Sequence, residues 1–112
     1  MKIATFNVNG INSRLALVLS WLAEARPDVA CLQELKSPDP NFPAAAIRDA
    51  GYGVLFHGQR AWNGVAILAR GTEPIETGRG LDGNSEDSQS GYLEAVVGGV
   101  IVGCLYLPNG NP

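Results

Sequence analysis

The chain has 112 residues, which is enough for one modest domain with its own hydrophobic core. Hydrophobic residues make up 46% of the sequence and charged residues 17%, so the polar, highly charged composition of a disordered chain is excluded. The formal net charge of −3 argues mildly against a nucleic-acid partner, because nucleic-acid-binding domains are often basic. A metal site needs local carboxylates, however, and a divalent cation can join an acidic protein to phosphate.

Targeting signals are not evident in the sequence. The N-terminal residues MKIATFNVNG lack the basic and apolar regions of a signal peptide. No apolar run approaches the ~18 residues that a membrane-spanning helix needs. Cys31 and Cys104 each lie in an apolar run, where a buried, reduced thiol is more common than a disulfide. We therefore expect a cytoplasmic protein with no membrane partner.

The first third of the chain predicts a strand, a helix and a second strand. Lys2–Val8 is rich in β-forming residues and stops at Asn9–Gly10. Apolar residues recur at helical spacing in Arg14–Ala25, and Pro27 ends that helix. Val29–Gln33 is a short apolar run typical of a buried strand. This order suggests a βαβ-like unit, whether or not its strands are adjacent.

The remaining segments predict one short helix and several strands. A helix from Pro43 to about Ala50 ends at Gly51. Strands are expected at Tyr52–His57, at Gly64–Ala69, briefly at Ile75–Thr77, and in a hairpin made of Tyr92–Val97 and Val100–Tyr106. Mixed strands and helices predict an α/β fold, but two helices are few for covering both faces of a sheet. The sequence therefore predicts one incomplete domain over residues 1–112.

Polar residues close the first two predicted strands. Asn7 ends the first strand and Glu34 directly follows the second, whereas Gln33 points to the opposite face. If these strands are neighbours, their carboxyl ends meet at the edge where open α/β sheets bind ligands. A carboxylate with an amide oxygen is a sensible partial site for a hard divalent cation. The alternative for Glu34 is an ordinary surface carboxylate.

Three further side chains have both a functional and a structural interpretation. Tyr106, near the end of the last strand, would donate to a phosphate oxygen at the same edge, or is a half-buried strand tyrosine. Trp62, beside Asn63 in a predicted turn, would stack against a nucleic acid, or folds back on the core. His57, the sole histidine, is more typical of a structural hydrogen-bonding residue than of a catalyst.

Several segments together resemble the exonuclease III class of apurinic/apyrimidinic (AP) endonucleases, within the endonuclease/exonuclease/phosphatase superfamily. They follow the family's order along essentially the whole chain: Ile3–Gly10, Pro27–Lys36, Gly51–Tyr52, His57–Gln59, Asn63–Leu68 and Tyr106–Gly110. The resemblance implies the N-terminal half of a four-layer α/β sandwich, with mostly one β-sheet and two helices. It also implies metal-dependent hydrolysis of DNA phosphodiesters at abasic sites and 3′ ends, in base-excision repair.

The resemblance implies a metal site at the strand ends. Glu34 matches the main metal-ligand carboxylate of this half, and Asn7 matches an asparagine that helps to bind the metal and the scissile phosphate. Asn9 matches a polar residue near the metal. The cofactor would be Mg²⁺ or Mn²⁺, which stabilises charge on the phosphoryl oxygens while an activated water attacks.

The resemblance also implies a DNA-binding surface. Tyr106 matches a tyrosine that contacts the phosphate in the active site, and Lys36 matches a basic residue just beyond the metal ligand. Trp62, with its neighbour Asn63, falls in a DNA-facing loop. The expected partner is double-stranded DNA with abasic sites or blocked 3′ ends, and no protein partner is evident.

Departures from the family pattern bear on activity. Family members are roughly twice this length, and their second half supplies Asp-x-Asn and Ser-Asp-His motifs that this sequence lacks. His57 matches a different family position, and Gly91 stands where relatives usually carry an arginine. The sequence therefore predicts a chain that is inactive alone. Two alternatives stay open: a non-catalytic DNA- or partner-binding remnant, and a fragment without a stable fold.

Overall fold

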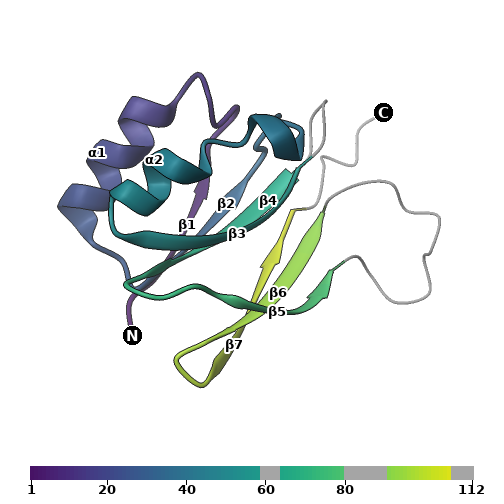
Figure 1. Ribbon diagram of the computed structural model, residues 1–112. Helices are drawn as coiled ribbons and strands as arrows, with labels where there is room; N and C mark the ends of the chain where they lie inside the picture. Colours follow the sequence, from purple (N-terminus) through teal and green to yellow (C-terminus); the bar gives the residue numbers. More distant parts are fainter. Residues whose placement is uncertain (59–63, 80–90, 107–112) are drawn as a thin grey trace.

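The computed structural model describes residues 1–58, 64–79 and 91–106. Figure 1 shows two helices on one side of a first sheet and a second sheet on its other side. The elements are β1 (Ile3–Asn7), α1 (Leu15–Ala25), β2 (Val29–Gln33), a 3₁₀ turn η1 (Asp39–Asn41), α2 (Ala44–Asp49), β3 (Tyr52–Gly58), β4 (Gly64–Arg70), β5 (Ile75–Arg79), β6 (Tyr92–Val97) and β7 (Val100–Leu105). Element types and most boundaries agree with the predictions from sequence.

The first sheet has the strand order β1-β2-β4-β3. β1 and β2 are parallel and are joined through α1, which confirms the predicted strand–helix–strand unit. β2 then pairs antiparallel with β4, so these two strands occupy the centre of the sheet. Both are apolar along almost their whole length, as strands covered on both faces must be.

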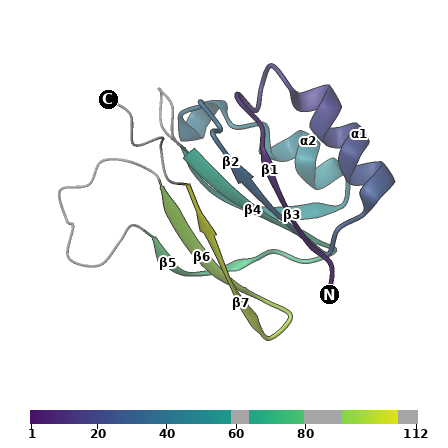
Figure 2. The ribbon, with the colours of Figure 1, turned by 180° about the vertical axis from the view of Figure 1, so that it is seen from behind.

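Helices α1 and α2 cover one face of the first sheet (Figure 2). Val18 and Leu22 of α1 and Ile47 of α2 are fully buried against this face. They meet Leu32 of β2 and Leu68 of β4, neither of which is exposed at all. Removing such side chains from water contributes about 1.5–3 kcal/mol each, which fixes the sheet against its helices.

The second sheet, β5-β6-β7, is antiparallel and packs its inner face on the other side of the first sheet. Leu93 and Val102 from this sheet meet Val65 and Ile67 of β4 in a second buried cluster. The hairpin between β6 and β7 turns at Gly98–Gly99, as predicted, and both glycines have positive φ. The outer face stays exposed: Ile101 retains 66% of its accessible surface.

The size of this second sheet corrects one expectation. The α/β class is confirmed, but the sequence predicted mostly one sheet, whereas the described residues form a second sheet of three strands. Ile75–Arg79 is longer than the predicted brief strand and pairs with β6 through a bulge between Glu76 and Gly78. Periodicity identifies strands, but it does not identify their partners. No helix among the described residues is long and apolar enough to cross a membrane.

Candidate active site

The carboxyl ends of β1 and β2 lie side by side, because Asn7 pairs with Gln33 in the parallel register. The chain keeps this pairing beyond both strands: the Gly10 amide donates to the Glu34 carbonyl at 2.8 Å, and the Ile11 amide donates to the Leu35 carbonyl at 2.9 Å. The segment after β1 and the segment after β2 therefore run together. This places Asn7 and Asn9 beside Glu34, as the strand order predicted.

The backbone at this edge is held in an uncommon conformation. Asn9, Glu34 and Lys36 all have positive φ, at 48°, 57° and 51°. Asparagine tolerates this left-handed region, but glutamate and lysine adopt it at a cost of about 1–3 kcal/mol each. The flanking hydrogen bonds and the burial of Leu35 hold the segment in place. The strain aims Glu34 away from the regular pleat of β2.

Close packing behind Glu34 depends on Gly64, at the start of β4. The Leu35 amide donates to the Gly64 carbonyl at 3.2 Å. A Cβ atom on Gly64 would lie 3.0 Å from the Leu35 Cβ, and Gly64 has a φ of 116°. This positioning role was not predicted, although a glycine directly after an asparagine at a strand start was a usable signal.

A short polar chain links the two asparagines to Lys36. The Asn9 amide donates to Oδ1 of Asn7 at 3.2 Å, which closes a local turn. The Lys36 Nζ donates to Oδ1 of Asn9 at 2.5 Å. One oxygen of Asn9 is therefore already engaged by a cation. Asn7 lies at the exposed surface, whereas Glu34 and Lys36 are half-buried.

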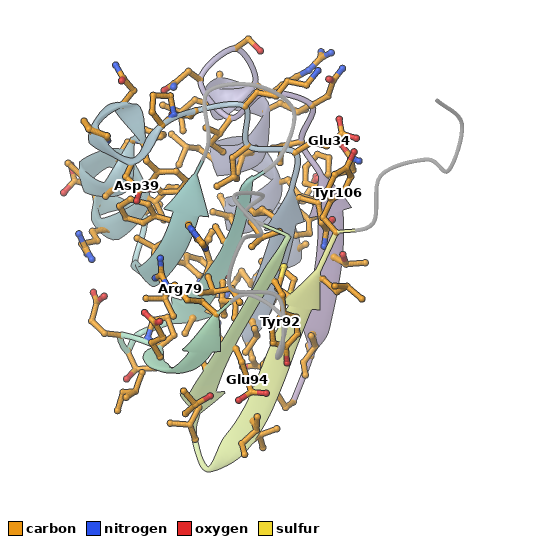
Figure 3. All side chains as sticks on the ribbon, turned by 90° about the vertical axis from the view of Figure 1, so that its right-hand side faces the viewer. Glu34, Asp39, Arg79, Tyr92, Glu94 and Tyr106 are labelled. Atoms are coloured by element: carbon orange, nitrogen blue, oxygen red, sulfur yellow. The ribbon has the colours of Figure 1, made fainter. Side chains whose placement is uncertain are left out.

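Tyr106 brings the second sheet to this edge. It follows β7, and its amide donates to the Gly91 carbonyl at 2.8 Å. Figure 3 shows the labelled Tyr106 and Glu34 side chains close together at the end of the sheets. Partial burial raises the pKa of Tyr106, and the hydrogen bond and charge of Glu34 raise it further. The phenol is therefore kept as an O–H donor beside a carboxylate.

Gln33 and His57, which the sequence also singled out, do not join Glu34 and Asn7 at this edge. The Gln33 Nε2 donates to Thr5 Oγ1 at 2.7 Å and to Cys104 Sγ at 3.7 Å, on the face of β2 that meets the second sheet. His57 lies on β3, which β4 separates from β2, so it does not join the site. Trp62 and Asn63 lie outside the described residues.

The donor set at the edge suits a hard cation in part. Among residues 1–58, 64–79 and 91–106, no cluster of three or more His, Cys, Asp or Glu side chains is present. Mg²⁺ commonly binds proteins through only one or two carboxylates, with substrate phosphates and water completing its shell. Glu34 supplies one carboxylate and Asn7 a neutral oxygen, so the arrangement fits a shared protein–substrate metal site better than a closed one.

The described residues therefore form a two-sheet α/β fold with a carboxylate and amide side chains at the strand ends. Residues 4–83 match the model of the endonuclease/exonuclease/phosphatase family. The chain belongs to this family.

Solved structures share the fold closely. A 3′ phosphatase from Neisseria bound to a product DNA hairpin superposes with a TM-score of 0.93 at 42% identity, over 98% of this chain and 42% of its own. An AP endonuclease from Archaeoglobus fulgidus gives a TM-score of 0.91, also at 42% identity and 42% of its length. The exodeoxyribonuclease III of Haemophilus influenzae is 37% identical over 85% of this chain. The chain spans only 35% of that relative.

Proposed function

We propose that this chain is part of a metal-dependent DNA phosphodiesterase that acts at abasic sites and 3′ ends in base-excision repair. The observation that carries the proposal is the Glu34–Tyr106 pair at the joint edge of the two sheets, in a chain of the endonuclease/exonuclease/phosphatase family. Relatives with the same fold include an exodeoxyribonuclease III and an AP endonuclease. The two free cysteines are also usual for a protein of the cytoplasm, where we place it.

Glu34 and Asn7 are the residues that would hold the cation. Glu34 supplies the carboxylate that directly follows β2 beside Asn7, and its strained backbone takes it out of the regular strand. Asn7 offers an exposed amide oxygen, and Asn9 would serve as a weaker ligand because Lys36 already occupies one of its oxygen lone pairs. A bound Mg²⁺ or Mn²⁺ would stabilise negative charge on the phosphoryl oxygens.

Tyr106 and Lys36 are proposed to contact the DNA phosphate. The raised pKa of Tyr106 keeps its hydroxyl protonated and able to donate to a phosphate oxygen. Lys36 lies two residues beyond Glu34 and brings positive charge to a protein whose net charge is negative. Trp62 and Asn63 are proposed as further DNA contacts, on the family resemblance alone.

The described residues bind and orient a phosphate but do not complete a hydrolytic site. Activation of water requires a general base within hydrogen-bond reach, and the single described histidine lies two strands away from β2. The chain also spans about two fifths of its solved relatives. We therefore propose that residues 1–112 form part of a larger domain and do not cleave DNA alone.

A second candidate function is a non-catalytic DNA- or partner-binding module. The net charge of −3 favours it, as does the lack of any cluster of three or more His, Cys, Asp or Glu side chains among the described residues. Binding without cleavage needs only the phosphate-facing donors of Tyr106 and Lys36. The two candidates differ in whether the edge takes up a cation.

Magnesium titration of the 112-residue chain, followed residue by residue in amide NMR spectra, tests the proposal. We expect Mg²⁺ to shift the signals of Asn7, Glu34 and Lys36, because the cation binds at this edge. Glu34→Gln is expected to abolish these shifts. Glu24→Gln, which removes an exposed carboxylate from α1, is the matched control and is expected to retain them.

Cleavage of a duplex with one abasic-site analogue completes this test. Wild-type chain in Mg²⁺ is expected to leave the duplex intact. Nicking that is lost in Glu34→Gln but kept in Glu24→Gln would show that the chain is sufficient for catalysis. Absence of Mg²⁺-dependent shifts in both the wild type and the Glu24→Gln control would overturn the metal site and favour the binding module.

A further inference from the structure

The two cysteines of the chain face each other across the layer between the sheets. Cys31 lies on β2 and Cys104 on β7, and both belong to the buried cluster that joins the two sheets. Cys31 retains 6% of its accessible surface and Cys104 retains 1%. They are the only cysteines in the sequence, so any thiol chemistry of the chain occurs here.

The two sheets approach closely at this point. Sγ of Cys104 donates to the Leu32 carbonyl at 3.6 Å, so the side chain of β7 reaches the backbone of β2. Nε2 of Gln33 donates to the same sulfur at 3.7 Å. The two thiols also lie close enough for each to shift the pKa of the other. Facing sheets usually lie about 10 Å apart, and a disulfide needs Cα atoms within about 7 Å, so only such a close approach permits a cross-link.

The pair is chemically unequal. The hydrogen bond from Cys104 lowers the pKa of Cys31, because it stabilises the Cys31 thiolate. The same hydrogen bond, together with burial, raises the pKa of Cys104. Cys31 is thus the thiol of the pair that ionises more readily. A nucleophilic thiolate next to a second thiol is the arrangement that redox-active pairs use.

A cleft gives small oxidants a path to the pair. It has a volume of about 520 Å³ and opens between the free edges of β1 and β7. Both cysteines line it, together with Ile3, Thr5 and Ile101. A molecule the size of hydrogen peroxide fits in this space easily. The cleft therefore connects solvent to two thiols that are otherwise covered by the strands.

We propose that Cys31 and Cys104 form a peroxide-responsive modification site that closes to a disulfide between the two sheets. The Cys31 thiolate attacks one peroxide oxygen, the O–O bond breaks, and the released hydroxide takes up a proton to form water. The resulting Cys31 sulfenic acid is attacked by the sulfur of Cys104; the S–S bond forms and the S–O bond breaks, releasing a second water. Two thiols lose two electrons and two protons, and peroxide is reduced to two waters.

The disulfide would act on the strand ends that carry the candidate active site. Cys31 precedes Glu34 by three residues on β2, and Cys104 precedes Tyr106 by two residues on β7. Hydrogen-bonded sulfurs lie farther apart than the ~2.05 Å of a disulfide, so oxidation draws β7 toward β2. The contact between Glu34 and Tyr106 changes as a result. This consequence does not depend on the bound cation or on DNA.

Mass spectrometry and thiol counting of the reduced 112-residue chain, treated with hydrogen peroxide, test the proposal. We expect wild-type chain to lose both free thiols and two hydrogen atoms of mass as a monomer, and dithiothreitol to restore both. Cys104→Ala lacks the resolving thiol, and its Cys31 is expected to accumulate as a sulfenic acid that a dimedone reagent traps. Cys31→Ala is expected to react more slowly than Cys104→Ala, because the remaining Cys104 thiol is the more buried of the two and its burial still raises its pKa.

A second measurement reports on the fold and on the strand ends. The alkaline titration of Tyr106 is expected to differ between the reduced and the oxidised wild type. In Cys104→Ala, which cannot form the disulfide, peroxide treatment is expected to leave this titration unchanged. Circular dichroism verifies that each variant is folded. Oxygen addition without loss of both thiols, or disulfide-linked dimers in place of the monomeric product, would overturn the proposal.

Discussion

The two sheets of this protein differ in how completely they are covered. In the first sheet, the six residues from Gly64 to Ala69 on β4 are all buried, because helices lie on one face and the second sheet on the other. In the second sheet, β7 alternates, with Val102 and Cys104 buried and Ile101 and Leu105 exposed. Coverage on two faces produces a continuous apolar run, and coverage on one face produces alternation. The centre of the first sheet is therefore covered on both faces, whereas the second sheet has one exposed face.

The largest expected difference in stability is between a buried position of the first sheet and an exposed position of the second sheet. Leu32→Ala in β2 removes a side chain with no exposed surface and is expected to reduce the free energy of unfolding by about 2–5 kcal/mol. Ile101→Ala in β7 removes an exposed side chain and is expected to change it by less than about 0.5 kcal/mol. Urea unfolding followed by circular dichroism measures both values. Equal losses would show that the outer face of the second sheet is covered in solution.

Two glycines, one in each sheet, allow the stability of the two sheets to be compared through the steric contact that an added Cβ would make. A Cβ on Gly53 of β3 would lie 2.0 Å from the Thr72 carbonyl oxygen, which is backbone and cannot turn aside. Gly53→Ala is therefore expected to destabilise the fold by about 1–3 kcal/mol. A Cβ on Gly103 of β7 would lie 3.0 Å from the Tyr92 hydroxyl, which can rotate away at the loss of its 2.8 Å hydrogen bond to Glu94. For Gly103→Ala we expect a loss under about 1.5 kcal/mol, and thermal unfolding of the two variants checks the order.

The smallest expected effect concerns two tyrosines at high pH. The pKa values of Tyr52, buried in the first sheet, and Tyr106, at the end of the second, are both raised, mainly by burial. A raised folded pKa means that each contribution to stability is present below the unfolded value of about 10 and is lost as pH rises through the folded pKa. Glu34→Gln is expected to lower the pKa of Tyr106 without returning it to the ordinary value, because burial persists. Ultraviolet titration of tyrosinate measures the shift, and the variants Tyr106→Phe and Tyr52→Phe assign the two groups. An unchanged Tyr106 titration in Glu34→Gln would contradict the contact between Glu34 and Tyr106.

The sequence predicted the local structure well and the long-range pairing less well. The spacing of apolar residues located α1 and the central strands. Periodicity contains no information about partners, so the second sheet was underestimated. Tyr106 was expected at the same edge, but its contact with Glu34 was not predicted. The left-handed backbone at Glu34 was not predictable, because a glutamate gives no signal for positive φ.

That left-handed backbone also affects how the protein would respond to selection. Asn9, Glu34 and Lys36 occupy conformations that a glycine adopts without strain. A library screened for heat resistance alone would therefore enrich glycine at positions 34 and 36, and each enriched clone would have lost a charge from the edge of the sheet. Consensus or thermostability engineering of this chain should hold these positions fixed. At Glu34 and Lys36, selection for heat resistance would therefore act against the charges of the candidate site.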